Sequence, residues 1–439
     1  MQRSLVGSEM CIRDRCKALI IGLQKRGAVV GSSLNTAYLL ERLSQTLERL
    51  ETLMAIFVSN RYLPRRILLL TGCFARAAAE RHSISRLWKQ SSGLMARSVT
   101  QNAGDHGEHY ITRDKKEYWA MFYSAAGGGV LIALMALFKT YLGSIIDDKV
   151  WKGIAEGLNY GLGFMVIFML HFTVATKQPA MTAARFAEAV EKTPQGKTVN
   201  MKLAQLLVDV FRSQSIAVLG NVLIAMGLAA LIAFGYQYKT GEPLMNADQI
   251  AYQLHSIDPF AGTLWFAAIA GVWLFCSGII SGYFDNRSNY LNMRMRLTQH
   301  PLLKKLMSEK TRVKFANYMH ENYGSLIGNL CFGMLLGITG VVGYLTHLPL
   351  DIRHVAFSSA NVGYIAVSGH FTYSLLLQCI SFVLLIGLVN LIVSFSLTLW
   401  VALRSLNAEI DSWWPIWHEV CQIVKKRPLS LFLPIQLDK

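Results

Sequence analysis

Three short segments concentrate the side chains whose types and spacing could support chemistry. They are GEHYITRD (107–114), GYFDNRSNY (282–290) and PLDIRHVAFSSAN (349–361), and each places a carboxylate, an arginine and a tyrosine or histidine close together. Such clusters most often cap helix ends and form local ion pairs. The functional alternative is a polar site at the boundary of a membrane.

Six residues are speculative binding residues. Five come from the second and third segments: Asp285, Arg287, Asp351, Arg353 and His354. The sixth, His171, is the good ionisable candidate inside an apolar stretch, where such a residue marks an ion or proton path. A hydrogen bond between helices explains His171 at least as well, and the amides Asn221 and Asn390 are typical of that role.

The chain lacks the sequence motifs of the common enzyme classes. It has no Walker motif, no G-x-S-x-G, no H-E-x-x-H and no C-x-x-C. Its seven cysteines show neither a disulfide framework nor a zinc-binding spacing, and they are interpreted as small buried hydrophobic residues. We therefore expect no metal and no cofactor.

Composition indicates a membrane environment. Of the 439 residues, 53% are hydrophobic and 16% are charged, whereas soluble domains carry about 25% charged residues. The formal net charge is nevertheless +16. A basic balance on an apolar chain indicates either nucleic-acid binding or loops that face an anionic leaflet, and the placement of the charges distinguishes the two.

Six stretches have the length and composition of membrane-spanning helices, which need about 20 residues. None contains an acidic residue, and aromatic residues gather near their ends, as in an interfacial belt. Lys139 is the one basic residue within the first five of these stretches. It lies near enough to the end of its stretch for the ammonium group to reach the lipid headgroups. We predict an all-α polytopic membrane bundle over 118–403, with spans at 118–142, 158–175, 215–236, 263–283, 325–345 and 373–403.

The loops between these stretches provide an independent test. Successive loops carry two, six, one, eight and one lysine plus arginine residues. The positive-inside rule places the two basic loops, 176–214 and 284–324, in the cytoplasm. An even number of spans then places the N-terminal region 16–117 and the tail 404–439 there as well. This arrangement explains the net charge without nucleic acid, while DNA binding by the same loops stays open.

The segment 354–371 has two interpretations. It is moderately apolar but rich in serine and glycine. It is either a re-entrant or interfacial segment, or a poor seventh span that would move the C-terminus to the other side. The basic tail favours the first interpretation.

The N-terminal region predicts cytoplasmic helices. Residues 1–15 include RSLVGSEMCIRDR, which we interpret as a non-native artefact and exclude. Apolar residues then follow a 3-4-3-4-3 spacing over less than three heptads, which predicts a packed helical hairpin whose second helix lies within 76–99. The residues of this seam are Leu40, Leu43, Leu47, Leu50, Met54 and Phe57.

Small residues recur four apart inside the predicted spans. Gly157 is followed by Gly161, Gly278 by Gly282, and Gly333 by Gly337. Glycines at this spacing let helix backbones approach closely in lipid. They predict a tightly packed bundle, with a substrate path as the less favoured alternative.

Several long motifs carry a family resemblance from residue 107 to the end. Besides the three polar segments they are KQPAMTAA (177–184) and KRPLSLFLP (426–434). On these residues the chain resembles the bacterial membrane proteins described as site-specific recombinases, the Gcr-type family. The resemblance implies recombination of DNA at specific sites.

A tyrosine recombinase needs a tyrosine nucleophile with two arginines and a histidine around the phosphate. Under the resemblance, Tyr110 with His109 and Arg113 are weak candidates for these roles. A second arginine has no evident counterpart, and no helix-turn-helix is recognisable. The sequence chemistry therefore gives the recombinase activity little support.

Two hypotheses follow. One is a DNA-recombination protein anchored in the bacterial inner membrane, which binds DNA through its basic loops. The other is a non-enzymatic envelope protein, namely a transporter, a channel-like bundle or a scaffold, surrounded by lipid and able to form a homo-oligomer. A transporter predicts a polar cavity lined by residues such as His171, Asn221 and Asn390.

Overall fold

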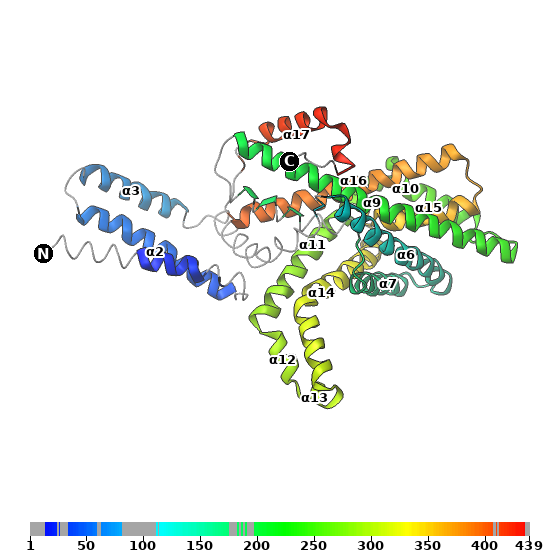
Figure 1. Ribbon diagram of the computed structural model, residues 1–439, viewed down its shortest axis with the longest axis horizontal. Coiled ribbons are helices and arrows are strands. Elements are labelled where there is room, and N and C mark those ends of the chain that lie inside the picture. Colours follow the sequence, from blue (N-terminus) through cyan, green and yellow to red (C-terminus); the bar gives the residue numbers. More distant parts are fainter. Residues whose placement is uncertain are drawn as a thin grey trace. The chain divides into compact units, whose positions relative to one another are not determined.

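The computed structural model of the chain describes residues 14–23, 26, 34–58, 63–80, 111–112, 114–174, 197–406, 410 and 412–434, with the short stretches 182–183, 186–187 and 189–190. Within these residues every regular element is a helix and none is a strand (Figure 1). The chain divides into two compact units, Met1–Asn102 with Tyr283–Glu321, and Ala103–Gly282 with Asn322–Lys439. The predicted all-α fold is confirmed.

Five described helices are long and apolar enough to cross a membrane. They contain five of the six predicted spans, so the expectation of a polytopic helical bundle is confirmed. These helices are α6 (Lys115–Ile145), α9 (Lys197–Thr240), α11 (Thr263–Tyr290), α14 (Glu309–Thr346) and α16 (Tyr373–Leu406).

The second predicted span, 158–175, has the wrong bounds. The helix there is α7 (Lys149–Met169), which starts nine residues earlier and ends before the predicted stretch does. Its first half contains Glu156, whose carboxylate lies 3.5 Å from the ammonium group of Lys139 on α6. Lys139 therefore forms an ion pair with a residue of a neighbouring helix. Its partner, Glu156, lies just outside the predicted bounds of the second span.

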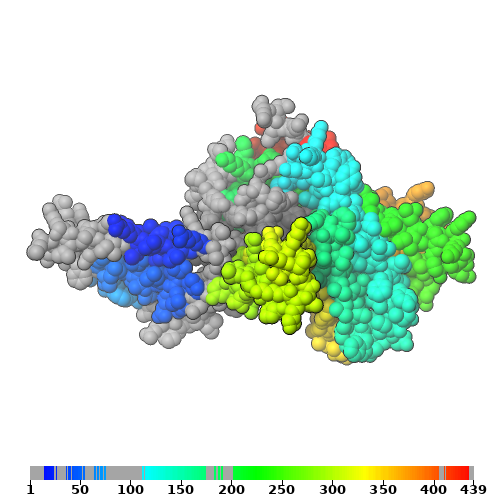
Figure 2. Space-filling view, turned by 60° about the horizontal axis from the view of Figure 1, so that its bottom comes forward, coloured from blue at the N-terminus to red at the C-terminus, as the bar shows by residue number. Residues whose placement is uncertain are grey.

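Helix α6 packs against both α7 and α9, and Figure 2 shows α6 and α7 (cyan to teal) beside the far end of α9 (green). Gly220 of α9 lies against Phe122 of α6, and further along Gly129 of α6 lies against Ala225 of α9. These two helices therefore run parallel. The connection 146–148 has three residues, and it returns α7 antiparallel to α6.

Close glycine contacts join α7 to α14, as the sequence predicted. A Cβ on Gly333 would overlap the backbone of Gly161, and a Cβ on Gly337 would overlap that of Gly157. Two of the three predicted glycine pairs thus face each other across an antiparallel contact.

The remaining long helices continue the alternation of direction. The indole N–H of Trp273 on α11 donates to Thr339 Oγ1 on α14 at 2.8 Å, and Gly328 of α14 lies against Ser277 of α11. These contacts make α11 and α14 antiparallel.

Gly271 of α11 lies against Val393 of α16, and one turn earlier Ala267 accepts a hydrogen bond from Asn390, so α11 and α16 run parallel. In chain order, α6, α7, α9, α11, α14 and α16 therefore alternate in direction.

Two shorter helices lie between the long ones. Helix α10 (Ala247–Ile257) precedes α11, and the turn between them contains η2 (Pro259–Ala261) and Gly262, whose φ of 82° suits a residue without a side chain. Helix α15 (Val355–Ser368) follows α14 after an extended segment, 347–354. We refer to 258–262 and 347–354 as the two interruptions.

Helix α15 falls in the segment with two sequence interpretations. Eleven of its 14 residues are buried, and it packs against α6, α9, α10 and α16. A helix of this length rises about 21 Å, less than the roughly 30 Å of a hydrocarbon core. It does not cross a bilayer alone, which agrees with the re-entrant interpretation.

The N-terminal helices form a hairpin, but its second helix differs from the predicted one. Helix α2 (Leu34–Val58) contains the heptad seam and packs against α3 (Leu63–Glu80). The predicted partner, 76–99, lies largely outside the described residues. Leu43 and Leu50 of the seam remain 49% and 47% exposed, so this hairpin covers the seam only in part.

The segment 283–321 contains the end of α11, the short helices α12 (Met293–Gln299) and α13 (Pro301–Leu306), and the start of α14. Asn292, with a φ of 47°, makes the turn into α12. Ser288 Oγ lies 3.1 Å from the Nδ1 of His320 and joins the two long helices. We call 283–321 the basic segment because it contains eight lysines and arginines and three acidic residues.

The chain ends in α17 (Trp414–Lys426) and η3 (Pro428–Leu431). Both pack against α9. They bring the motif KRPLSLFLP to the first half of that helix.

Candidate functional site

The proposed recombinase residues cannot be placed. His109, Tyr110 and Arg113 all lie outside the described residues. The same segment does provide a helix cap, because Asp114 accepts a hydrogen bond of 2.7 Å from the backbone N–H of Glu117 at the start of α6.

Asp285 and Arg287 lie near the end of α11, in the basic segment. The guanidinium of Arg287 donates to the hydroxyl of Tyr283, one turn earlier, at 3.2 Å. Asp351, Arg353 and His354 belong to the other compact unit, where the second interruption contains all three.

Arg353 connects the two interruptions. Its backbone N–H donates to the carbonyl of Phe266 at 3.2 Å, and its Nε donates to the carbonyl of Ser256 at 2.7 Å. The guanidinium also lies 5.4 Å from the ring of Phe266. The indole N–H of Trp265 adds a 3.1 Å bond to the carbonyl of Pro349. One arginine thus ties the end of α10 and the start of α11 to the segment before α15.

The charge of Arg353 is balanced locally. Its Nη1 lies 2.6 Å from a carboxylate oxygen of Asp351 and also donates to the carbonyl of Ile352 at 2.8 Å. The Arg353 side chain is 14% exposed, and that of Asp351 is 38% exposed. A cation that is mostly buried is stable when a carboxylate and carbonyls surround it.

Asn390 of α16 completes this junction. Its amide donates to the carbonyls of Ala267 and Arg353 at 2.7 and 3.0 Å, and its oxygen accepts from the backbone N–H of Val355 at 3.2 Å. Asn390 is fully buried. Its hydrogen bonds fix the start of α15 against α11 and α16.

His354 sits among aromatic rings. Its ring centroid lies 6.2, 5.7 and 5.9 Å from those of Phe164, Phe332 and Phe357. The residue is 1% exposed. It is packed as part of the hydrophobic core.

His171, predicted inside the second span, lies just after the helix that occupies that region. It follows the end of α7 in an exposed turn, where its φ is 58° and its carbonyl accepts a hydrogen bond from Ser124 Oγ. Asn221 is buried and donates to the carbonyls of Ala125 and Thr173. His171, Asn221 and Asn390 have different hydrogen-bond partners.

One buried arginine joins three segments of the chain. The sequence had suggested that this residue was one of the basic residues of the loop 176–214. Arg212, on α9, is 4% exposed and pairs with Asp209 at 2.9 Å. Its Nη2 donates to the carbonyl of Thr112 at 2.6 Å, and its Nη1 donates to that of Ser430 at 3.4 Å. Two of the family-like motifs, GEHYITRD and KRPLSLFLP, therefore meet at Arg212. The two motifs were visible in the sequence, but their common contact with Arg212 was not.

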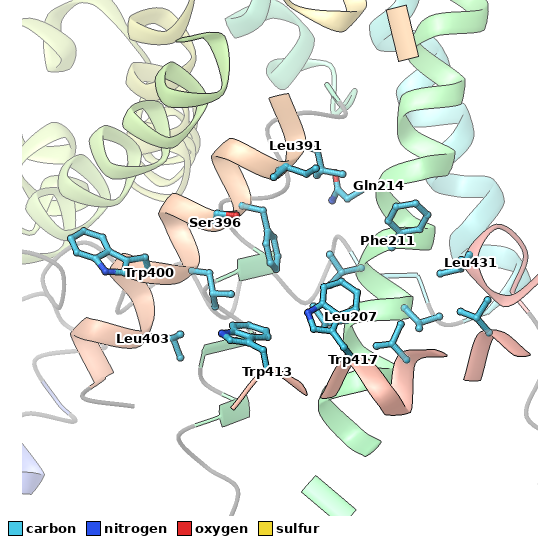
Figure 3. A pocket seen from close by; sticks show the side chains of 17 residues that line it. Leu207, Phe211, Gln214, Leu391, Ser396, Trp400, Leu403, Trp413, Trp417 and Leu431 are labelled. Atoms are coloured by element: carbon cyan, nitrogen blue, oxygen red, sulfur yellow. The ribbon is translucent and has the colours of Figure 1, made fainter. Parts of the chain in front are cut away.

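A large apolar groove lies beside this junction, between α9, α16 and α17. Its volume is about 780 Å³. Figure 3 shows Leu207 and Phe211 of α9 and Leu391 and Leu403 of α16 around it, with Trp413 and Trp417 closing one side. The full lining is Leu207, Val208, Val210, Phe211, Gln214, Leu391, Ile392, Phe395, Ser396, Leu399, Trp400, Leu403, Trp413, Trp417, Val420, Val424 and Leu431.

The residue spacing on α17 explains how it forms one wall. Trp413, Trp417, Val420 and Val424 follow one another by four, three and four residues, so they share a helix face. Trp413 also stacks on Phe186 with the ring centroids 6.1 Å apart. This spacing was visible in the sequence, but the opposite walls come from elements far away in the chain.

No metal centre is evident in the described residues, where no group of three or more His, Cys, Asp or Glu is placed to bind an ion. The apolar groove, the Arg353 junction and the Arg212 junction are built features of the helical bundle. The five long apolar helices fit a polytopic α-helical membrane protein.

Comparison with known proteins identifies the family. A family model described as "Site-specific recombinase" matches residues 8–434, and the chain belongs to this family. No curated protein matches the chain. No solved structure matches it either.

Proposed function

We propose that this chain is a non-enzymatic protein of the bacterial inner membrane that binds an amphipathic ligand in the groove between α9, α16 and α17. The apolar groove is the observation that carries the proposal. Pockets of about 300–1,000 Å³ with mainly apolar linings and a few polar groups are typical ligand sites. Gln214 and Ser396 are such polar groups here.

The membrane topology that goes with this proposal has six passes. Helix α7 is 21 residues long and would span about 31 Å, so it provides a sixth pass once Lys139 and Glu156 neutralise each other. Six passes of alternating direction leave both termini in the cytoplasm, on the side of the basic loops.

The polar residues of the bundle support a binding role without catalysis. Arg353, Asn221 and Asn390 direct their hydrogen bonds to carbonyl and carboxylate groups of the chain itself. Groups used in this way hold helices together. This leaves the groove as the better place for a ligand.

Ligand binding is testable by native mass spectrometry of the purified full-length chain with a palmitoyl lysophospholipid as the probe. Ser396 is exposed and lines the groove, so Ser396→Trp should fill the space and reduce retention of the probe at least tenfold. Ser381 is also exposed on α16 but does not line the groove, and Ser381→Trp should leave retention unchanged. Equal retention by both variants would refute a ligand site in the groove.

A second candidate function is DNA binding, which the family name suggests and the basic segment favours. Arg294, Arg296, Lys304 and Lys305 are exposed there. Among the described residues no carboxylate lies within ion-pair distance of these four side chains. They are therefore available for phosphate groups.

DNA binding would show a steep dependence on salt. Four phosphate contacts predict an affinity loss of about a hundredfold between 50 and 200 mM salt, which fluorescence anisotropy with duplex DNA can measure. A strand-cleavage assay with Tyr110→Phe as the control tests recombinase chemistry. No binding at low salt would exclude this candidate.

A further inference from the structure

We infer that the ligand of the groove is an anionic phospholipid, with one acyl chain in the groove and its phosphate at a basic rim. This inference rests on the proposed ligand-binding function and names the ligand class. The apolar lining and the charges around it carry the argument.

The groove opens beside two of the helices that are long and apolar enough to cross a membrane, α9 and α16. In a bilayer such helices are surrounded by acyl chains. Trp400 and Trp417 are both 54% exposed at the groove, and tryptophan favours the level of the lipid headgroups. An acyl chain is thus the apolar molecule present at the highest concentration at this opening.

Basic residues lie at both ends of the groove. The guanidinium of Arg404 is 5.5 Å from the ring of Trp400 at one end. Lys425, Lys426 and Arg427 directly follow the lining residue Val424 at the other end, and all three are exposed. In the part of the chain that the structure describes, none of these four cations has a carboxylate within ion-pair distance.

The nearby buried arginine does not compete for the phosphate. Arg212 is already paired with Asp209 and bonded to two carbonyls. Among the residues that the structure describes, the positive charge without a carboxylate partner is therefore at the rim. Each Lys or Arg near a membrane surface contributes about 1 kcal/mol of attraction to anionic lipid.

Competition between two lipids tests the inference. The full-length chain is equilibrated with equal amounts of phosphatidylglycerol and phosphatidylcholine that carry the same acyl chains, and the retained lipids are counted by native mass spectrometry. We expect a preference for phosphatidylglycerol of about tenfold or more. The variant Lys425→Glu/Lys426→Glu should abolish this preference.

The matched control is Lys304→Glu/Lys305→Glu, which makes the same change of charge in the basic segment. It should keep the preference. Equal retention of both lipids by the native chain, combined with loss of both in Ser396→Trp, overturns the anionic ligand but leaves the ligand site standing. Lipid retention that does not respond to Ser396→Trp overturns the inference and the proposed function together. Melting curves in detergent establish that each variant is folded.

Discussion

Arg353 illustrates how a single residue stabilises an interrupted bundle. Its backbone and side chain together bind Phe266, Ser256 and Asp351, which belong to α11, α10 and the second interruption. Removing one partner of a mostly buried ion pair leaves polar groups that no longer have water or a partner. The stability of the junction therefore depends on this side chain.

Arg353→Leu should lower the free energy of unfolding by about 2–3 kcal/mol, since Asp351 is partly exposed and regains some hydration. Chemical denaturation of the purified protein in detergent measures this change. Arg287→Leu is the control, because Arg287 is exposed and bonds only to Tyr283 among the described contacts. It should cost less than about 0.5 kcal/mol. Similar losses for both variants would contradict a special role for Arg353.

Lys139 and Glu156 should behave as a pair. Lys139→Met removes a cation and leaves the carboxylate of Glu156, which is 14% exposed, facing apolar surroundings. We expect a loss of about 1–2 kcal/mol for this variant and a partial recovery in Lys139→Met/Glu156→Gln. A double-mutant cycle of unfolding free energies gives the coupling. Strictly additive effects would show that the two side chains do not interact.

At the level of the helices, the contact between α7 and α14 depends on glycine. Gly333 and Gly337 lie against the backbone of Gly161 and Gly157, so the two helix axes approach more closely than larger residues would allow. The short helix α15 gains its stability in a different way, since it is buried on nearly all sides.

Gly333→Ala should separate α7 from α14 and lower the free energy of unfolding by about 2 kcal/mol, because the added methyl group meets backbone that cannot move aside. Gly340→Ala, on the same helix, places its methyl group in open space and should be neutral or slightly stabilising. Thermal unfolding in detergent distinguishes the two. A neutral Gly333→Ala would mean that the helices are not in close contact.

A helix could be predicted from the sequence where its own residues are enough to identify it as a membrane span. Five spans could be predicted because each carries about 20 consecutive apolar residues. The bounds of α7 could not, because Glu156 looks unsuitable for a membrane until Lys139 of α6 is placed beside it. The groove was missed for a related reason, since its walls come from α9, α16 and α17. Arg212 looked like a loop charge because its partners, Thr112 and Ser430, are far away in the sequence.

For the whole molecule, the alternation of helix directions has a consequence for sidedness. If six helices cross the bilayer, the turn 241–246 and the short helices α12 and α13 lie on opposite sides. The basic segment then faces the cytoplasm, in accordance with the positive-inside rule.

Cysteine labelling can test this topology. In a chain whose seven cysteines are replaced by alanine, a cysteine in place of Glu242 should react with an impermeant maleimide on intact cells. A cysteine in place of Lys304 should react only after the membrane is opened. Labelling of both positions from outside, or of neither, would require a different number of crossings.

The contacts of Arg212 also bear on how the two ends of the bundle communicate. Its guanidinium bonds to Thr112, just before the first long helix, and to Ser430, just after the last helix of the chain. A displacement at the entrance to α6 would therefore pull on η3, and with it on Leu431 in the wall of the groove.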